Sequence, residues 1–486
     1  MSLNLEITAE GYSPNDLDKM PIVAYESTLN VLLEETKKLC KGEINKRSVY
    51  IEGYYGSGKT MFLRKLAHLA VNQIENVVPI YVYLGSDGIG LGDVYDSYVD
   101  IIKEYTNSGK VTLPEGRVKI VGKPESWKNK IDVMENVRQY IKSLKGKLSV
   151  EAFYEGMRKL NKEAFYPMLI LDEFERLIYT GEGIRKATEI GKDAYKEAGY
   201  FFGKYLELTR GHIFSGVIIV TSTRDVLELL KIAISEGRTE HLKGIGEQLG
   251  LDLVGHPEYF PMVQGNVAYD YNIKLRWGED KMIQLAKVLE LQVNENIIRS
   301  LARILPVPRA LLNLVKLAQT KGMTLNSEKD LYGIVKEKFE ELKSTLLTER
   351  TSDNRPLITV QSRWLDRFEE LLKSGMWYIT KNRYIEVAEA FGIPFDEKGR
   401  VKVVEQLKSL YKKGLLDKEG IGTYAINKSI FAFLLGIDRL PNGQDANKHN
   451  IILEIKTKVQ EEREENRQKR SKKKEGVDED DQKRLS

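Results

Sequence analysis

The sequence predicts an α/β protein with a parallel sheet, followed by a helical segment, a small module of three helices and a hairpin, and a charged tail. Three observations predict this fold. A glycine-rich loop joins a β-type apolar run to a helical pattern within residues 48–70. Further apolar runs alternate with helical patterns, as expected when helices connect parallel strands. From Glu279 to about Leu347 the pattern is wholly helical, so we expect the sheet to end before that segment.

Length and composition restrict the class of protein. A chain of 486 residues is too long for one ordinary core, so two or three domains are expected. No apolar run approaches the roughly 20 residues that span a bilayer, and Met1–Glu10 lacks a secretory pattern, which predicts a cytoplasmic protein. The single cysteine, Cys40, excludes a disulfide within one chain. The net charge of +4 is too mild to indicate nucleic acid by itself.

Residues 53–60 read G-Y-Y-G-S-G-K-T, a complete phosphate-binding loop. The glycines allow the backbone N–H groups to point at a triphosphate, Lys59 supplies a positive charge, and the Thr60 hydroxyl can ligate Mg²⁺. The β-type run 48–52 precedes the loop and a helical pattern follows it, so the helix N-terminus faces the phosphates. The residues predicted to contact the nucleotide here are Gly53, Gly56, Ser57, Gly58, Lys59, Thr60 and Met61.

Three more core strands are predicted at 78–84, 168–171 and 216–221. The second of these ends in Asp172-Glu173. At the carboxyl edge of a parallel sheet, Asp172 can hold Mg²⁺ directly or through water, and Glu173 can accept a proton from an attacking water. An acidic turn after a strand is the alternative explanation, and the phosphate loop upstream favours the catalytic one.

Two polar residues later in the chain could contact the γ-phosphate. Thr223, with Ser222 as second choice, follows the strand at 216–221. Pro308 pre-sets a helix start and places Arg309 on the first turn. A cation is electrostatically unfavourable at that position, which mildly favours a functional role for Arg309 over that of an ordinary surface arginine.

These four elements, in this order, resemble the AAA+ ATPases, with Walker A at 53–60, Walker B at Asp172 and Glu173, sensor 1 at Thr223 and sensor 2 at Arg309. The resemblance implies ATP and Mg²⁺ as cofactors, a homo-oligomer when ATP is bound, and slow hydrolysis by the monomer. It also implies an arginine finger in trans, for which Arg238 is the first candidate and Arg224 or Arg210 the next, and an adenine pocket formed by residues 21–23, including Ile22 and Val23. Initiator-type members usually carry Asn where this chain has Thr223.

Residues 359–438 form the compact module after the helical segment. Helical patterns at 361–373, 384–391 and about 400–413 precede a predicted hairpin at 415–426, which together indicate a winged helix. A winged helix narrows the resemblance to initiator-type members, similar to archaeal origin-recognition proteins that act in DNA replication. The basic residues predicted to contact duplex DNA are Lys398, Arg400, Lys402, Lys408, Lys412, Lys413 and Lys418.

The predicted domains are 1–278 for the nucleotide-binding α/β core, 279–350 for a helical lid, 351–440 for the winged helix and 441–486 for a charged, disordered tail. Two functions remain open. The first is an ATP-dependent switch that binds duplex DNA in an initiator-like or DNA-remodelling role. The second is a signalling or scaffold ATPase, of the mobile-element or defence type, whose winged helix or tail docks a protein partner.

Overall fold

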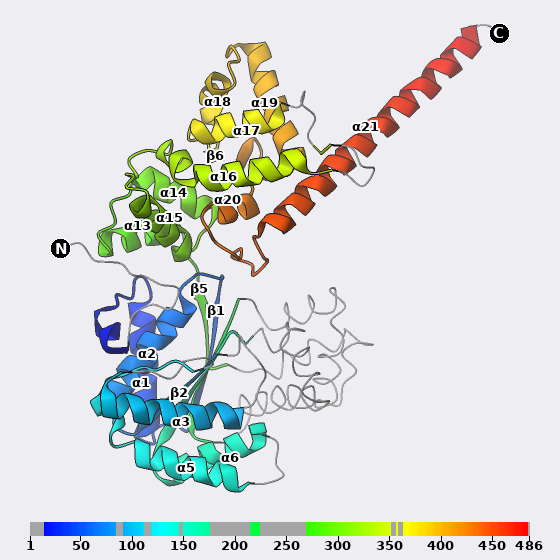
Figure 1. The fold of residues 1–486 in the computed structure, drawn as a ribbon. Coiled ribbons are helices and arrows are strands. Elements are labelled where there is room, and N and C mark those ends of the chain that lie inside the picture. Colours follow the sequence, from blue (N-terminus) through cyan, green and yellow to red (C-terminus); the bar gives the residue numbers. More distant parts are fainter. Residues whose placement is uncertain are drawn as a thin grey trace. The chain divides into compact units, whose positions relative to one another are not determined.

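The computed structural model describes residues 14–83, 91–110, 118–144, 149–174, 214–223, 269–350, 356–357 and 363–484 (Figure 1). The chain divides into two compact units. The first comprises Met1–Tyr54 and Gly58–Arg276, and the second comprises Tyr55–Ser57 and Trp277–Ser486. Among the described residues, none of the helices combines the length and the apolar character needed to cross a membrane.

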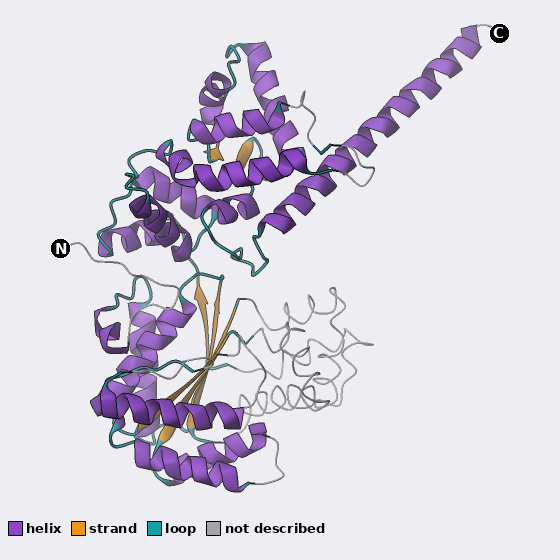
Figure 2. Cartoon of the chain, in the orientation of Figure 1, coloured by secondary structure: helices purple, strands orange, loops and turns teal. Residues whose placement is uncertain are grey.

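The first unit contains the predicted parallel sheet (Figure 2). Its strands are β1 (Lys46–Gly53), β2 (Val77–Tyr83), β3 (Tyr166–Asp172), β4 (Gly216–Ser222) and β5 (Tyr271–Leu275), in the order β2-β3-β4-β1-β5. Every pairing between neighbours is parallel. The prediction of a parallel α/β core is therefore confirmed, and the first four strands were predicted. The edge strand β5 was not.

Helices cover this sheet, and the interior between them is apolar. They are η1 (Pro14–Lys19), α1 (Glu26–Cys40), α2 (Lys59–Gln73), α3 (Leu91–Ser108), α4 (Pro124–Trp127), α5 (Ile131–Ser143) and α6 (Ser149–Lys162). Ile51 of β1, Leu63 of α2 and Leu169 of β3 are each fully buried in one continuous core. Burial of this apolar surface fixes α2, and with it the phosphate loop, against the sheet.

The second unit begins with the helical segment that the sequence predicted. Its helices are α13 (Glu279–Val288), α14 (Glu295–Ile304), α15 (Pro308–Thr320) and α16 (Asp330–Thr348). Pro308 is the first residue of α15, where its missing N–H costs no helical hydrogen bond. Arg309 therefore lies in the first turn, as predicted.

Three helices and a small antiparallel sheet follow α16 in the same unit, the arrangement predicted for a winged helix. The helices are α17 (Trp364–Lys373), α18 (Tyr384–Ala390) and α19 (Glu397–Lys412), with η3 (Lys381–Arg383) before α18. Strands β6 (Tyr378–Ile379), β7 (Leu416–Gly420) and β8 (Thr423–Ile426) form a sheet in the order β6-β8-β7, and α20 (Lys428–Leu434) follows it. The β7–β8 hairpin is the predicted wing.

In the charged C-terminal segment, where a frayed helix followed by a disordered tail is expected, Lys448–Arg484 form one helix, α21 (Figure 1). Ile451, Ile455 and Val459, spaced four residues apart on one face, are buried. This stripe lies where α21 packs on α19 and α20. The first part of α21 is therefore held by apolar contacts that the charge content of the segment concealed.

Candidate functional site

The loop at residues 53–60, the predicted phosphate loop, has a backbone that only glycine adopts without strain at two positions. Gly56 and Gly58 adopt φ angles of 79° and 90°, in the left-handed region that glycine reaches without strain. Helix α2 starts directly at Lys59 with no acidic residue in its first turn. The positive end of the helix dipole thus favours an anion at this point. Lys59 is buried, and its Nζ donates to the Gly53 carbonyl at 2.7 Å, which closes the loop.

Thr60 and Asp172, the two predicted Mg²⁺ ligands, lie together in the first unit. Thr60 Oγ1 donates to Asp172 Oδ2 at 2.8 Å, although the two residues are 112 positions apart in the sequence. Asp172 is fully buried at the carboxyl end of β3. Glu173 follows it, half-buried, with a left-handed backbone at φ 59°. A non-glycine residue in this conformation is strained, and such strain concentrates at functional sites.

Two buried hydroxyls that the sequence reasoning missed also bond to Asp172. Tyr81 on β2 donates to Oδ2, and Thr221 on β4 donates to Oδ1. Burial, and next the charge of Asp172, raise the pKa of Tyr81 well above its ordinary value, so its hydroxyl stays a donor. Both residues belong to strands that are otherwise mostly apolar. The only sequence signal for a role in the site is a polar side chain near the carboxyl end of a strand.

The second unit contains the tip of the phosphate loop, Tyr55–Ser57, together with Arg309. The Arg309 guanidinium lies over the Tyr55 ring at 4.5 Å, and its backbone N–H donates to the Gly56 carbonyl at 3.3 Å. A Cβ on Gly56 would lie 2.8 Å from that of Arg309, so only glycine fits there. Arg309 is thus packed on loop residues of its own unit. Trp277, also unmarked by the sequence, donates from Nε1 to the Ser57 carbonyl at 2.8 Å.

The residues present fit a magnesium–nucleotide ligand. A hydroxyl and a carboxylate oxygen are the hard ligands that Mg²⁺ prefers, and this ion commonly takes one or two protein groups, with phosphates and water completing its shell. The described residues include no cluster of three or more His, Cys, Asp or Glu side chains able to bind a metal. In the second unit, Ser57 Oγ is buried with no hydrogen-bond partner among the described residues. Such an atom would gain a partner from a phosphate oxygen.

The other residues predicted to contact the nucleotide differ in how deeply they are buried. Met61 and Ile22 are half-buried and pack against the core, and Val23 is buried. Thr223 is half-buried, one residue past the end of β4. The arginine-finger candidates Arg238, Arg224 and Arg210 lie outside the described residues.

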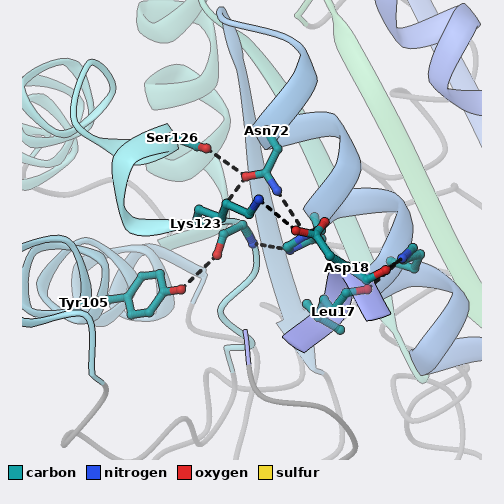
Figure 3. Close-up of polar contacts among 9 residues, drawn as sticks. Leu17, Asp18, Asn72, Tyr105, Lys123 and Ser126 are labelled. Atoms are coloured by element: carbon teal, nitrogen blue, oxygen red, sulfur yellow. Dashed lines mark hydrogen bonds and ion pairs between the residues drawn. The ribbon is translucent and has the colours of Figure 1, made fainter. Parts of the chain in front are cut away.

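A polar cluster anchors η1, which leads into residues 21–23 (Figure 3). His68 on α2 is fully buried, accepts at Nδ1 from the Gly122 N–H at 3.1 Å, and bonds through Nε2 to Asp18 Oδ1 at 2.7 Å. Because Nδ1 accepts, the proton of the neutral ring sits on Nε2 and is donated to Asp18. Lys123 also pairs with Asp18 at 2.8 Å. Lys65 donates to the Leu17 carbonyl at 2.7 Å, which fixes the backbone of η1.

We expect the first unit to lose stability as the pH falls below about 6.5, because burial lowers the pKa of His68 from its ordinary value of 6.5. Below pH 6.5 the imidazole of the unfolded chain binds protons more readily than that of the folded chain. The stabilisation that neutral His68 contributes is therefore complete above pH 6.5 and is lost as the pH falls toward the lower pKa of the folded protein. The free energy of unfolding should change by at most about 1.4 kcal/mol per pH unit. Asp18, whose pKa is lowered to about 2 by its bonds to Lys123 and His68, loses its contribution only below pH 3.8.

Urea unfolding of the wild type and of His68→Gln between pH 7.5 and 5 measures this effect. The wild type should lose stability relative to the variant, which has no group at this position that titrates. A difference between the two proteins that stays constant over the whole range would contradict the prediction.

The predicted DNA-contacting residues lie on and around α19. This helix carries five basic and two acidic residues. Lys398, Arg400, Lys402, Lys408, Lys412 and Lys418 are exposed. Apart from Lys412, which pairs with α21, this exposure leaves their charges accessible to phosphates. Ile421, at the turn of the hairpin, is 88% exposed. The surface is thus basic along the helix, with one apolar side chain at the wing tip.

Two of the predicted contacts are engaged by α21 instead. Lys413 bonds to Glu462 at 2.8 Å and to Ser409 at 2.9 Å, and its side chain is only 12% exposed. Lys412 pairs with Glu465 at 3.5 Å. We therefore expect Lys413 to contribute less to DNA binding than the sequence alone suggested, because a phosphate would have to displace Glu462.

The parallel sheet places the paired Thr60 and Asp172 in one α/β unit. Several solved structures are similar to this chain. Cdc6p from Pyrobaculum aerophilum is 14% identical, with a TM-score of 0.38, over 87% of this chain and 98% of that one. The Aeropyrum pernix ORC1 protein, solved in complex with DNA, is 11% identical, with a TM-score of 0.37, over 86% and 93%.

AMPPCP-bound DnaA from Aquifex aeolicus is 13% identical, with a TM-score of 0.31, over 82% of this chain and 91% of that one. No protein-family model matches the chain, and no curated protein matches it. With identities below 25% and TM-scores below 0.5, function has to be argued from this chain's own residues.

Proposed function

We propose that the protein is an ATP-binding, slowly hydrolysing AAA+ switch that binds duplex DNA through α19 and the β7–β8 hairpin. The hydrogen bond between Thr60 and Asp172 carries the ATPase part of the proposal, because it joins the start of α2, directly after the phosphate loop, to the acidic end of β3. Hydrolysis needs a metal ligand and a base at this position. Asp172 and Glu173 supply them in adjacent residues.

Each residue has a distinct role in this proposal. Lys59 and the N–H groups at the start of α2 bind the phosphates. Thr60 and Asp172 would hold Mg²⁺, which would neutralise phosphate charge. Glu173 accepts the proton of the attacking water. Thr223 and Arg309 contact the γ-phosphate. For Arg309, a charge-assisted hydrogen bond to phosphate would replace the weaker contact of its guanidinium with the Tyr55 ring.

The DNA part of the proposal is supported by the exposed basic residues of α19. They give an affinity that is independent of sequence and falls steeply with salt. An initiator-like or DNA-remodelling role and an ATP-dependent homo-oligomer are the further parts of the proposal. The exposed Ile421 would contact whichever partner the hairpin meets.

Fluorescence anisotropy of a labelled duplex, titrated with Glu173→Gln protein in ATP and then in ADP across a salt series, tests the proposal. We expect tight, salt-sensitive binding in ATP and weaker binding in ADP. No binding at low salt in either nucleotide would refute the DNA function and direct attention to a protein partner of the hairpin and α19.

A further inference from the structure

Thr221 joins the two acidic residues of the candidate site through one buried hydroxyl. Its Oγ1 donates to Asp172 Oδ1 at 2.5 Å and accepts from the Glu173 N–H at 3.1 Å. The residue is fully buried in β4. A hydroxyl can donate and accept at the same time, so Thr221 restrains the side chain of one acid and the backbone of the next.

Strand pairing fixes this position. Leu171 is paired with Val220 in the β3–β4 ladder, which brings the following residues, Asp172 and Thr221, side by side. Beyond the ladder, the Phe174 N–H donates to the Thr221 carbonyl at 2.8 Å. The chain around Glu173 is thus tied to Thr221 at two points. These ties hold Glu173 in its left-handed conformation, which non-glycine residues keep only when their surroundings impose it.

The Asp172 carboxylate receives hydrogen bonds on both oxygens. Oδ2 accepts from Thr60 and Tyr81, and Oδ1 accepts from Thr221 and the Glu173 N–H. A carboxylate has about four acceptor positions, so the group cannot rotate without losing a bond. Of these donors, Thr221 alone also accepts from the Glu173 backbone, and so it couples the orientation of both acids.

We propose that Thr221 is a positioning residue of the nucleotide-hydrolysing centre, which sets Asp172 relative to Thr60 and sets the direction in which Glu173 leaves the strand. The inference rests on the proposed ATPase function. It deepens that function by assigning a role to a strand residue two positions before the expected sensor, Thr223. Misplacement of reacting groups by about 1 Å can cost 100-fold in rate.

Thr221→Val tests the proposal, because valine keeps the shape and removes only the hydroxyl. ATP turnover should fall about 10- to 100-fold, whereas the affinity for a fluorescent ADP analogue without Mg²⁺ stays within about threefold of the wild type. Mg²⁺ should raise the affinity of Thr221→Val for the ADP analogue less than it raises that of the wild type, because Asp172 has lost its hydrogen bond from Thr221. Thr221→Ser, which keeps the hydroxyl, should restore both, and thermal unfolding of each variant shows whether a loss reflects folding.

Asp172→Asn separates positioning from a general packing effect. If Thr221 acts through Asp172, Thr221→Val should not reduce the Mg²⁺-dependent gain further in the Asp172→Asn background. An equal reduction in both backgrounds would overturn the proposal, as would turnover of Thr221→Val within about twofold of the wild type. If the turnover of Thr221→Val is close to that of the wild type, the proposed ATPase function is unaffected and only the role of Thr221 is refuted. A wild-type protein that binds no nucleotide would overturn both together.

Discussion

Glu173→Gln is expected to lower ATP turnover by about 10²–10⁴-fold, the usual contribution of a general base. Glutamine has nearly the same shape but cannot take the proton of the attacking water. The left-handed backbone at φ 59° is equally demanding for both residues, so the fold should be unaffected. Affinity for ATP should change by less than about threefold, because the side chain acts in the transition state. Phosphate release and equilibrium nucleotide binding measure the two quantities.

Lys59→Ala is the matched control for a loss of binding. Lys59 closes the loop on the Gly53 carbonyl and supplies the phosphate charge, so this variant should lose nucleotide affinity as well as turnover. If Glu173→Gln turns over ATP at the wild-type rate, Glu173 is not the base and the proposed mechanism is wrong.

Removing three charges from the start of α19, with Lys398, Arg400 and Lys402 all changed to Ala, should weaken duplex binding about tenfold or more at low salt. The slope of log affinity against log salt should fall in magnitude by about 3, one for each DNA phosphate that the variant no longer neutralises. All three side chains are exposed, so the fold should tolerate the change. Anisotropy titrations between 50 and 200 mM salt, roughly the range over which phosphate contacts change affinity most, measure the effect.

A second triple variant controls for net charge. Lys316, Lys329 and Lys336 are exposed and belong to α15, α16 and the turn between them, away from the α19 sequence. Changing them to Ala removes the same charge and should leave the salt slope unchanged. Equal losses from both triples would mean that DNA responds to overall charge and that α19 is not the contact surface.

The sheet and the acidic strand end were predictable because each rests on a strong local pattern. Strands β2 to β4 contain near-continuous apolar runs, as expected for buried parallel strands. Strand β1 has only a short apolar stretch, residues 49–51, and was marked by the glycine-rich loop that follows it. Strand β5 alternates half-buried and exposed residues before the buried Leu275, and its short length at the sheet edge gave no comparable signal. Its position beside β1 is therefore known only from the structure.

The details of the site depended on register, which a single sequence does not reveal. A polar residue just past the end of a strand is the usual place for a sensor, which selects Thr223, whereas Thr221, inside the strand, makes the contacts with Asp172. Tyr81 is hidden in the same way, because it lies within an apolar strand run. In the winged-helix-like module, the ion pair between Lys413 and Glu462 joins residues 49 positions apart, beyond the reach of any local pattern.

The hydrogen bond from Trp277 to the Ser57 carbonyl gives the molecule an optical probe of its own phosphate loop. The chain has four tryptophans, and the other three, Trp127, Trp364 and Trp377, are buried in packed cores. If a ligand at the loop alters this hydrogen bond, the emission of Trp277 should change. Intrinsic fluorescence would then report the proposed nucleotide binding without a label, and replacing Trp277 with Phe identifies the part of the signal that comes from it.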